Sequence, residues 1–410
     1  GLEFADFIIK SENVSAVERS LSDIISSTVD DSSVIPKNKS LVKATLLGVI
    51  RDVIYRGSQE EKEYLRRLSS SYMLLFLLQC DPKVATYFAT LAGKTKIFVC
   101  TSLLVPALSE FPLEKPHRRH WNLLVKASQA GIKLLVNGVI IRELAGHIRK
   151  SVQVFEEEYE RYKGIYTDEI AIPYIKEILI RSYFYSLLEG EKHSFHKFID
   201  NFVTPNSQNM EEELIEWLKY NFNIEYIDEE SMDVSLDMDD LKKLTDELSK
   251  YKPSERQART DAKTALNVYA LREKYNERGE AGIFGYQTWV LSKDTITQKA
   301  VTNCFGNKYC TSCYIRPDFV YNYISLAPNY DEVTKIFDTM FPTLPGISVS
   351  HHVPGEICDI VHESVKEHSE KDPARIRAIL RDLTDKLKTD PNAINVHQLR
   401  HYLDDPEPLK

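Results

Sequence analysis

The stretch KIFVCTSLLVPAL, residues 96–108, joins a short apolar run to a polar pair and then to a second apolar run that contains a proline. The run KIFV favours a buried β-strand, and the residues after Cys100 are typical of a helix. In α/β proteins, ligands bind just beyond the carboxyl ends of the strands. Cys100, Thr101 and Ser102 are therefore the first candidate site residues.

The next segments continue an alternation of helix and strand. We predict a helix in HRRHWNLLVKASQAG (117–131), a strand in IKLLV (132–136) and a long helix that starts after Asn137 and Gly138. Strands and helices that alternate at these lengths predict right-handed crossovers and a parallel sheet with helices on its faces. The fold class that follows is α/β, with a Rossmann-like sheet.

The alternation stops and later resumes. Residues 151–252 favour helices and read as a helical, acidic insertion, whereas 254–277 predict a helix, 285–294 a strand and 308–317 a last strand. We therefore expect an α/β domain over residues 94–325. A helical N-terminal region would precede it over residues 1–93, and a mostly helical region would follow it over residues 326–410.

Composition limits the classes of function. The chain has 410 residues, of which 43% are hydrophobic, and its longest apolar run, at residues 72–78, is far shorter than the roughly 18 residues that a membrane span needs. Its N-terminus, GLEFADF, lacks the pattern of a secretion signal, and its six cysteines are too sparse for a disulfide scaffold. These features favour a cytoplasmic protein that does not enter a membrane.

The net charge of -9 is concentrated in one segment. Residues 211–250 hold 14 Asp and Glu against 4 Lys, a net charge of -10, so the rest of the chain is close to neutral. Proteins that bind nucleic acids usually carry a basic surface. Because the acidity belongs to one segment, it does not exclude a nucleic-acid partner elsewhere on the molecule.

Three acidic residues stand at comparable places in the alternation. Glu143 lies in the first turns of the helix after the second strand, Asp261 lies near the start of a later helix, and Asp294 follows the strand in WVLSKD. Each has an ordinary explanation: Glu143 could pair with a neighbouring arginine, Asp261 could favour a helix dipole, and Asp294 could cap a helix. Their order along the chain is the more specific signal.

These motifs together resemble the PIN-domain ribonucleases. The matching stretches are IFVCTSLLVPAL, LLVNGVIIRELAGHI, RTDAKTALNVYAL and WVLSKDTITQKA, and they cover parts of residues 94–150 and 253–325. The resemblance implies a PIN-like fold and a metal-dependent nuclease that hydrolyses phosphodiesters, with single-stranded RNA as the expected substrate and a DNA flap as the alternative. It implies that Glu143, Asp261 and Asp294 hold Mg²⁺ or Mn²⁺, and that Cys100 and Ser102 line the site.

Cys100 departs from the family pattern, which has an aspartate there. A thiol is a soft ligand that is normally protonated at neutral pH, so it is a poor partner for Mg²⁺. Four explanations stay open: Ser102 and water replace the carboxylate, the site takes a softer ion such as Mn²⁺ or Zn²⁺, the site is inactive, or the aspartate was replaced deliberately. Cys100 could also be a packed thiol.

Basic residues near these motifs are candidates for substrate binding. They are Arg118, Arg119, Arg259 and Lys293, with Trp121 as a surface for base stacking. A charged helix start is more often simply solvated. The competing interpretation of the whole chain is a degenerate PIN-like scaffold that binds protein partners or nucleic acid through its helical additions. We find no glycine-rich phosphate loop or G-x-S-x-G motif that would indicate another α/β enzyme.

Overall fold

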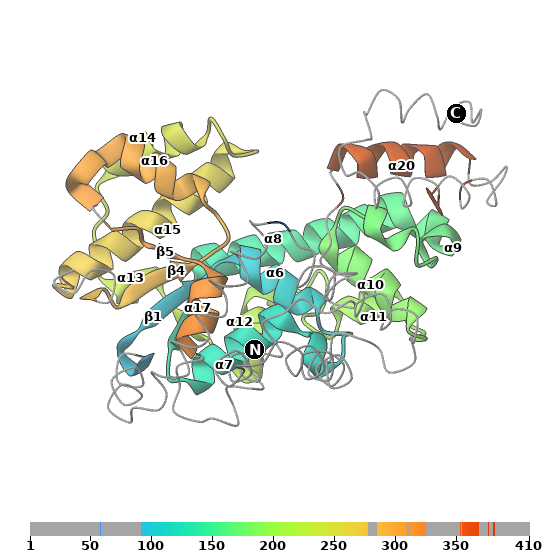
Figure 1. Ribbon diagram of the computed structural model, residues 1–410, viewed down its shortest axis with the longest axis horizontal. Helices are drawn as coiled ribbons and strands as arrows, with labels where there is room; N and C mark the ends of the chain where they lie inside the picture. The colour runs from blue at the N-terminus through green and yellow to red at the C-terminus, as the bar shows by residue number, and fades with distance from the viewer. Residues whose placement is uncertain are drawn as a thin grey trace.

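A five-stranded sheet lies at the centre of the computed structural model (Figure 1). The structure describes residues 58, 92–277, 285–309, 311–324, 353, 355–368, 376, 380 and 381. The strand order is β3-β2-β1-β4-β5, and all four pairings are parallel. The strands are β1 Lys96–Val99, β2 Lys133–Asn137, β3 Glu225–Ile227, β4 Thr288–Leu291 and β5 Tyr314–Ile315.

The central strand β1 is apolar because it is covered on both faces. Ile97, Phe98 and Val99 are each at most 1% exposed, and Phe98 pairs with Leu135 of β2 on one side and Val290 of β4 on the other. Strands that are buried on both faces of a parallel sheet are expected to be continuously hydrophobic rather than alternating. This burial fixes β1 at the middle of the sheet.

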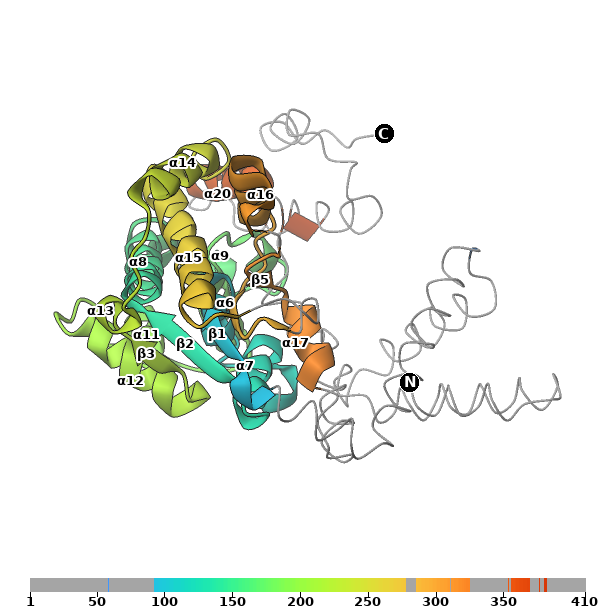
Figure 2. The same cartoon turned by 90° about the vertical axis from the view of Figure 1, so that its left-hand side faces the viewer.

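Helices cover both faces of the sheet (Figures 1 and 2). On one side, α15 packs on β4, and α14 and α16 pack beyond it; on the other, α7 packs on β2, and α12 packs on β3. These helices and their neighbours in the α/β region are α6 Thr101–Ser109, α7 Arg119–Gln129, α8 Gly138–Val154, α12 Met210–Phe222, α14 Met238–Leu248, α15 Glu255–Lys274, α16 Ile296–Phe305 and α17 Pro317–Ile324.

A second group of helices extends from the end of α8 and lies at the right of Figure 1. It contains α9 Lys163–Tyr166, α10 Ile178–Leu188, α11 Phe195–Ile199 and, from the C-terminal part of the chain, α20 Gly355–His368. Tyr166 and His362 join α9 to α20 through a hydrogen bond of 2.6 Å. Short turns complete the path: π-helix η2 Phe155–Tyr159, and the 3-10 helices η1 Lys115–His117, η3 Glu160–Tyr162, η4 Ile172–Tyr174 and η6 Gly306–Tyr309.

The sheet confirms the predicted α/β class and corrects one boundary. The strands expected at residues 96–99 and 132–136 form as β1 and β2, the latter shifted by one residue. Residues 151–252, expected to be helical, also contain the edge strand β3, which is followed by the short helix α13 Glu229–Met232. The insertion therefore completes the sheet.

Most of residues 1–93 and of residues 326–410 lies outside the described residues. Of the two terminal regions predicted to be helical, the structure therefore bears mainly on α20, which is a helix. Within the described part of the chain, no helix has both the length and the apolar character that crossing a bilayer requires.

The strand order places a topological switch point between β1 and β4. From β1 the chain moves outward to β2 and β3, and then returns to the other side of β1 for β4 and β5. In open α/β sheets, the connections on either side of such a point diverge, and ligands bind there, beyond the carboxyl ends of the strands. Cys100 follows β1 and Ser292 follows β4, so both lie at this point.

Candidate active site

The ends of β1 and β4 are joined by hydrogen bonds beyond the last paired residues. The Cys100 N–H donates to the Leu291 carbonyl at 3.1 Å, and the Ser102 and Ser292 hydroxyl oxygens lie 3.3 Å apart. The Lys293 N–H donates to Ser102 Oγ at 3.4 Å. Ser102 therefore links the two strand ends at the floor of the candidate site.

Asp261 and Asp294 meet at one lysine. Lys252 Nζ lies 2.6 Å from Asp261 Oδ2 and 2.7 Å from Asp294 Oδ2. Lys252 precedes α15, Asp261 lies in the second turn of that helix, and Asp294 follows β4. The side chain of Lys252 is only 10% exposed, so a largely buried ammonium bridges two carboxylates that come from different elements.

Asp294 also has a local role at the start of α16. Its Oδ1 accepts from the Ile296 N–H at 2.7 Å, and its Oδ2 accepts from the Thr297 hydroxyl. Although burial raises the pKa of Asp294, the hydrogen bonds from Lys252, Thr297 and Ile296 lower it below its usual value. The capping role considered from the sequence is therefore present, and it coexists with the contact to Lys252.

Glu143 lies on α8 and belongs to the same charged cluster. Burial raises its pKa, while a hydrogen bond with Thr101 and the charges of Lys252 and Arg256 oppose that rise. Glu143 in turn acts on Asp261: burial raises the pKa of Asp261 to about 6, and the charges of Asp294 and Glu143 add to that rise against Lys252. The three predicted acids therefore share one electrostatic environment.

Cys100 lies beside this cluster as a neutral group. Burial raises the pKa of its thiol, and the charges of Glu143 and Asp261 raise it further, while hydrogen bonds with Ser102 oppose the rise. A thiol in such surroundings stays protonated at neutral pH. Cys100 also occupies the N-cap position of α6, and its Sγ lies 3.9 Å from Thr101 Oγ1.

The carboxylates have the chemistry of a Mg²⁺ or Mn²⁺ site, since hard cations prefer oxygen ligands. In the part of the chain that the structure describes, however, no group of three or more Asp, Glu, His or Cys side chains is arranged to hold a metal ion. The contacts explain this difference, because Asp261 and Asp294 both face Lys252 Nζ. A divalent ion would share these carboxylates with Lys252 or displace it.

The predicted basic residues are placed differently from one another. Arg118 donates to the Leu113 carbonyl at 2.6 Å and lies over the rings of Phe111 and Trp121, so it holds the loop before α7 rather than a substrate. Arg259 is exposed on α15, two residues before Asp261. Of the two, Arg259 is the more exposed.

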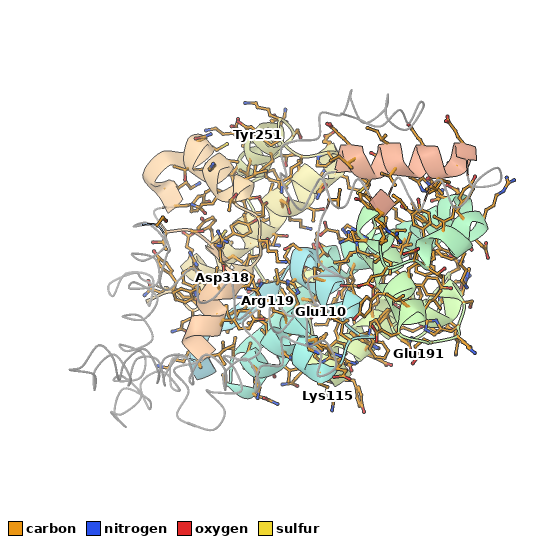
Figure 3. The ribbon with its side chains drawn as sticks, turned by 45° about the vertical axis from the view of Figure 1, so that its right-hand side comes forward. Glu110, Lys115, Arg119, Glu191, Tyr251 and Asp318 are labelled. Carbon is orange, nitrogen blue, oxygen red and sulfur yellow. The ribbon has the colours of Figure 1, made fainter. Side chains whose placement is uncertain are left out.

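Arg119 and Lys293 lie on the α7 side of the switch point. Arg119 pairs with Asp318 of α17 at 3.4 Å, and Figure 3 shows the two side by side, with Glu110 on the other side of Arg119 in that view. Lys293 Nζ lies 2.7 Å from His120 Nε2. Both cations are therefore held in place by neighbouring polar groups.

Trp121 does not present a surface for base stacking. Its ring packs edge-to-face against Trp217 at 5.6 Å and against Phe222 at 4.7 Å, measured between ring centroids. These contacts join α7 to α12, and aromatic pairs in this geometry stabilise packing. The sequence suggested stacking with a base, whereas in the structure the partly buried ring packs against the core.

Sequence reasoning missed Lys252, His120 and Glu110. Lys252 lies just before Pro253 in a polar connection, where nothing in the pattern sets it apart from a solvated lysine. Glu110 and His120 are separated by a loop, and their contact depends on how that loop folds.

No known protein family, curated protein or solved structure matches this chain.

Proposed function

We propose that this chain is a PIN-like nuclease that hydrolyses phosphodiesters of single-stranded RNA with Mg²⁺ or Mn²⁺. One observation carries the proposal: Glu143, Asp261 and Asp294 come from three separate elements and interact at the switch point of the sheet. Carboxylates that lie close together repel one another, and this repulsion raises the free energy of the folded protein. A bound cation removes that cost.

Charge balance suggests how an ion would be accommodated. With Cys100 neutral, three ionised carboxylates and Lys252 leave a net charge of -2, which matches one divalent ion. When bound, such an ion would polarise the phosphate and lower the pKa of the attacking water. Glu143, Asp261 and Asp294 would hold it, Ser102 would line the site, and Arg259 would contact the RNA backbone.

Cleavage of a fluorescein-labelled 20-nucleotide RNA without secondary structure tests the proposal. We expect cleavage with Mn²⁺ that EDTA abolishes, and a loss of about 100-fold in rate for Glu143→Gln, because the variant removes one anionic ligand of the ion. Glu356→Gln on the exposed face of α20 is the matched control and should cut normally. Equal cleavage by Glu143→Gln and the wild type would refute the assignment.

A second candidate, a degenerate PIN-like scaffold that binds protein partners or nucleic acid, is favoured by two observations. Cys100 removes one anionic ligand, and Lys252 already neutralises part of the charge of the remaining acids. Cys100→Asp separates the two functions. A scaffold is inactive as it stands and gains Mn²⁺-dependent cleavage only after the substitution, whereas a working enzyme already cuts RNA without it.

A further inference from the structure

Glu110, His120 and Lys293 form a continuous hydrogen-bonded chain that ends at the residue before Asp294. His120 Nδ1 lies 2.6 Å from Glu110 Oε1, and His120 Nε2 lies 2.7 Å from Lys293 Nζ. Glu110 is 3% exposed and His120 is 7% exposed, so the inner part of the chain is buried. Buried polar groups are retained where each finds a partner, and here the last partner is the ammonium of Lys293, the residue that precedes Asp294.

We assign the protons of this chain from its contacts. Glu110 Oε2 accepts from the Trp121 N–H at 2.9 Å, which leaves Oε1 to accept from His120 Nδ1–H. A neutral imidazole with its proton on Nδ1 has Nε2 free as an acceptor, and Lys293 is the donor within reach. One ammonium proton is thereby committed, and two remain for another acceptor.

In the sequence, Lys293 lies between two residues that belong to the candidate site. The residue before it, Ser292, contacts Ser102, and the residue after it, Asp294, contacts Lys252. The Lys293 side chain turns toward α7 instead, where Arg119 also lies. Burial and the charge of Arg119 lower the pKa of Lys293 below its usual value, and the charges of Glu110 and Asp318 oppose that shift. Arg119, Glu110 and Asp318 therefore all act on this ammonium.

We propose that Lys293 binds a phosphodiester anion next to the acidic cluster, and that Glu110 and His120 are positioning residues that hold its ammonium there. The proposal rests on the proposed function for its ligand, a phosphate of single-stranded RNA. A lysine is a flexible cation that loses side-chain entropy when it binds. A buried partner that already restrains it reduces that cost, as preorganisation does in general.

The hydrogen-bonded chain offers a substitution that keeps shape and reverses polarity. Glu110→Gln has only one acceptor oxygen, and the fixed Trp121 N–H claims it. The amide NH₂ then faces His120 Nδ1, which must accept, so the proton moves to Nε2 and the contact with Lys293 is lost. Lys293→Met removes the ammonium itself and alters an exposed residue.

The test is a double-mutant cycle on binding of fluorescein-labelled oligouridylate of 15 nucleotides, measured by anisotropy in EDTA with the full chain. Lys293→Met should weaken binding several-fold and reduce the salt dependence of log Kd by about 0.7, the value for one phosphate contact on a single strand. Glu110→Gln should also weaken binding. Because it acts through Lys293, the double variant should be no weaker than Lys293→Met alone.

The outcomes separate a positioning role from a structural one. Additive losses in the double variant, or binding by Lys293→Met equal to that of the wild type, would overturn the proposal, as would a wild-type protein that does not bind the oligonucleotide. Lys150→Met, at an exposed lysine of α8 that pairs with Glu177, is the control and should bind normally. No metal is present, so a failure of Mn²⁺-dependent cleavage would count against the proposed function alone.

Discussion

Lys252 Nζ lies 2.6 Å from Asp261 Oδ2, and the same nitrogen lies 2.7 Å from Asp294. A single buried ammonium thus joins two acids that are 33 positions apart in the sequence. Although burial lowers the pKa of Lys252, its hydrogen bonds to both aspartates raise it, so it remains charged at neutral pH. The protein carries its own cation at the site where the proposed function requires a divalent one.

Removal of this internal cation should strengthen metal binding. Lys252→Met leaves Asp261 and Asp294 without their ammonium, and opposite charges at such distances interact by several kcal/mol at an intermediate dielectric. We expect calorimetry to show Mn²⁺ binding about 10-fold tighter or more. Lys250→Met, an exposed lysine of the same segment paired with Glu247, should leave the affinity unchanged. Equal or weaker Mn²⁺ binding by Lys252→Met would contradict the account.

Cys100→Asp should trade stability for metal affinity. The new carboxylate would lie near Glu143 and Asp261, and a buried charge without a partner costs roughly 1–3 kcal/mol or more. Thermal melting in EDTA should therefore show a less stable variant. Saturating Mn²⁺ should raise its melting temperature more than that of the wild type. Cys100→Ser, which adds no charge, should show neither effect; a similar shift in both variants would rule out the charge argument.

The free energy of unfolding should respond to pH through Asp261. Burial raises its pKa from 3.8 to about 6, so between these values the folded state holds a proton that the unfolded chain releases. This contribution to stability is complete below 3.8 and is lost as pH rises through 6. Asp261→Asn lacks it, so the variant should be more stable than the wild type by about 1 kcal/mol or more above pH 7.

That advantage should shrink as pH falls from about 7 to 4, because protonation relieves the wild type of the same cost. Chemical denaturation at several pH values measures both proteins. Asp246→Asn, at an exposed position of α14, serves as the control and should track the wild type. A difference that is constant with pH would show that the pKa of Asp261 is not raised.

Arg272 of α15 should be a major contributor to stability around β4. It is 4% exposed, its guanidinium donates to the carbonyls of Thr288 and Ser312, and it lies over the rings of Tyr286 and Trp289, 4.3 and 4.5 Å from their centroids. Arg272→Met leaves those carbonyls unpaired and should lower the free energy of unfolding by about 2–4 kcal/mol. Arg149→Met, on the exposed face of α8, should change it by less than about 0.5 kcal/mol.

The buried strands of the fold were predictable from their apolar sequence. β1 and β2 are continuous apolar runs because both faces of the sheet are covered, and that pattern is visible in the sequence. β3 was missed because Glu225 and Tyr226 are exposed at the sheet edge and the strand has only three residues. Such a segment has no hydrophobic pattern of its own, and its pairing with β2 depends on the rest of the sheet.

In the candidate site, too, some residues were predictable from the sequence and others depend on tertiary contacts. Glu143, Asp261 and Asp294 were found because polar residues near the ends of buried strands, or early in the helices around them, stand out from the apolar pattern. Arg118 and Trp121 lie in an equally polar context, but their tertiary contacts place them in the packing around α7. Lys252 shows the opposite case, since only the fold brings an ordinary lysine between two acids. Partners of this kind depend on contacts that local patterns do not encode.

Calorimetric titration of Mn²⁺ into the wild-type chain and into Glu143→Gln/Asp261→Asn tests the central claim most directly. If the three acids form one cation site, the wild type should bind one Mn²⁺ per chain with a dissociation constant below about 1 mM, and the double variant should show no saturable binding. Identical titrations of the two proteins, or no binding by the wild type at millimolar Mn²⁺, would contradict it.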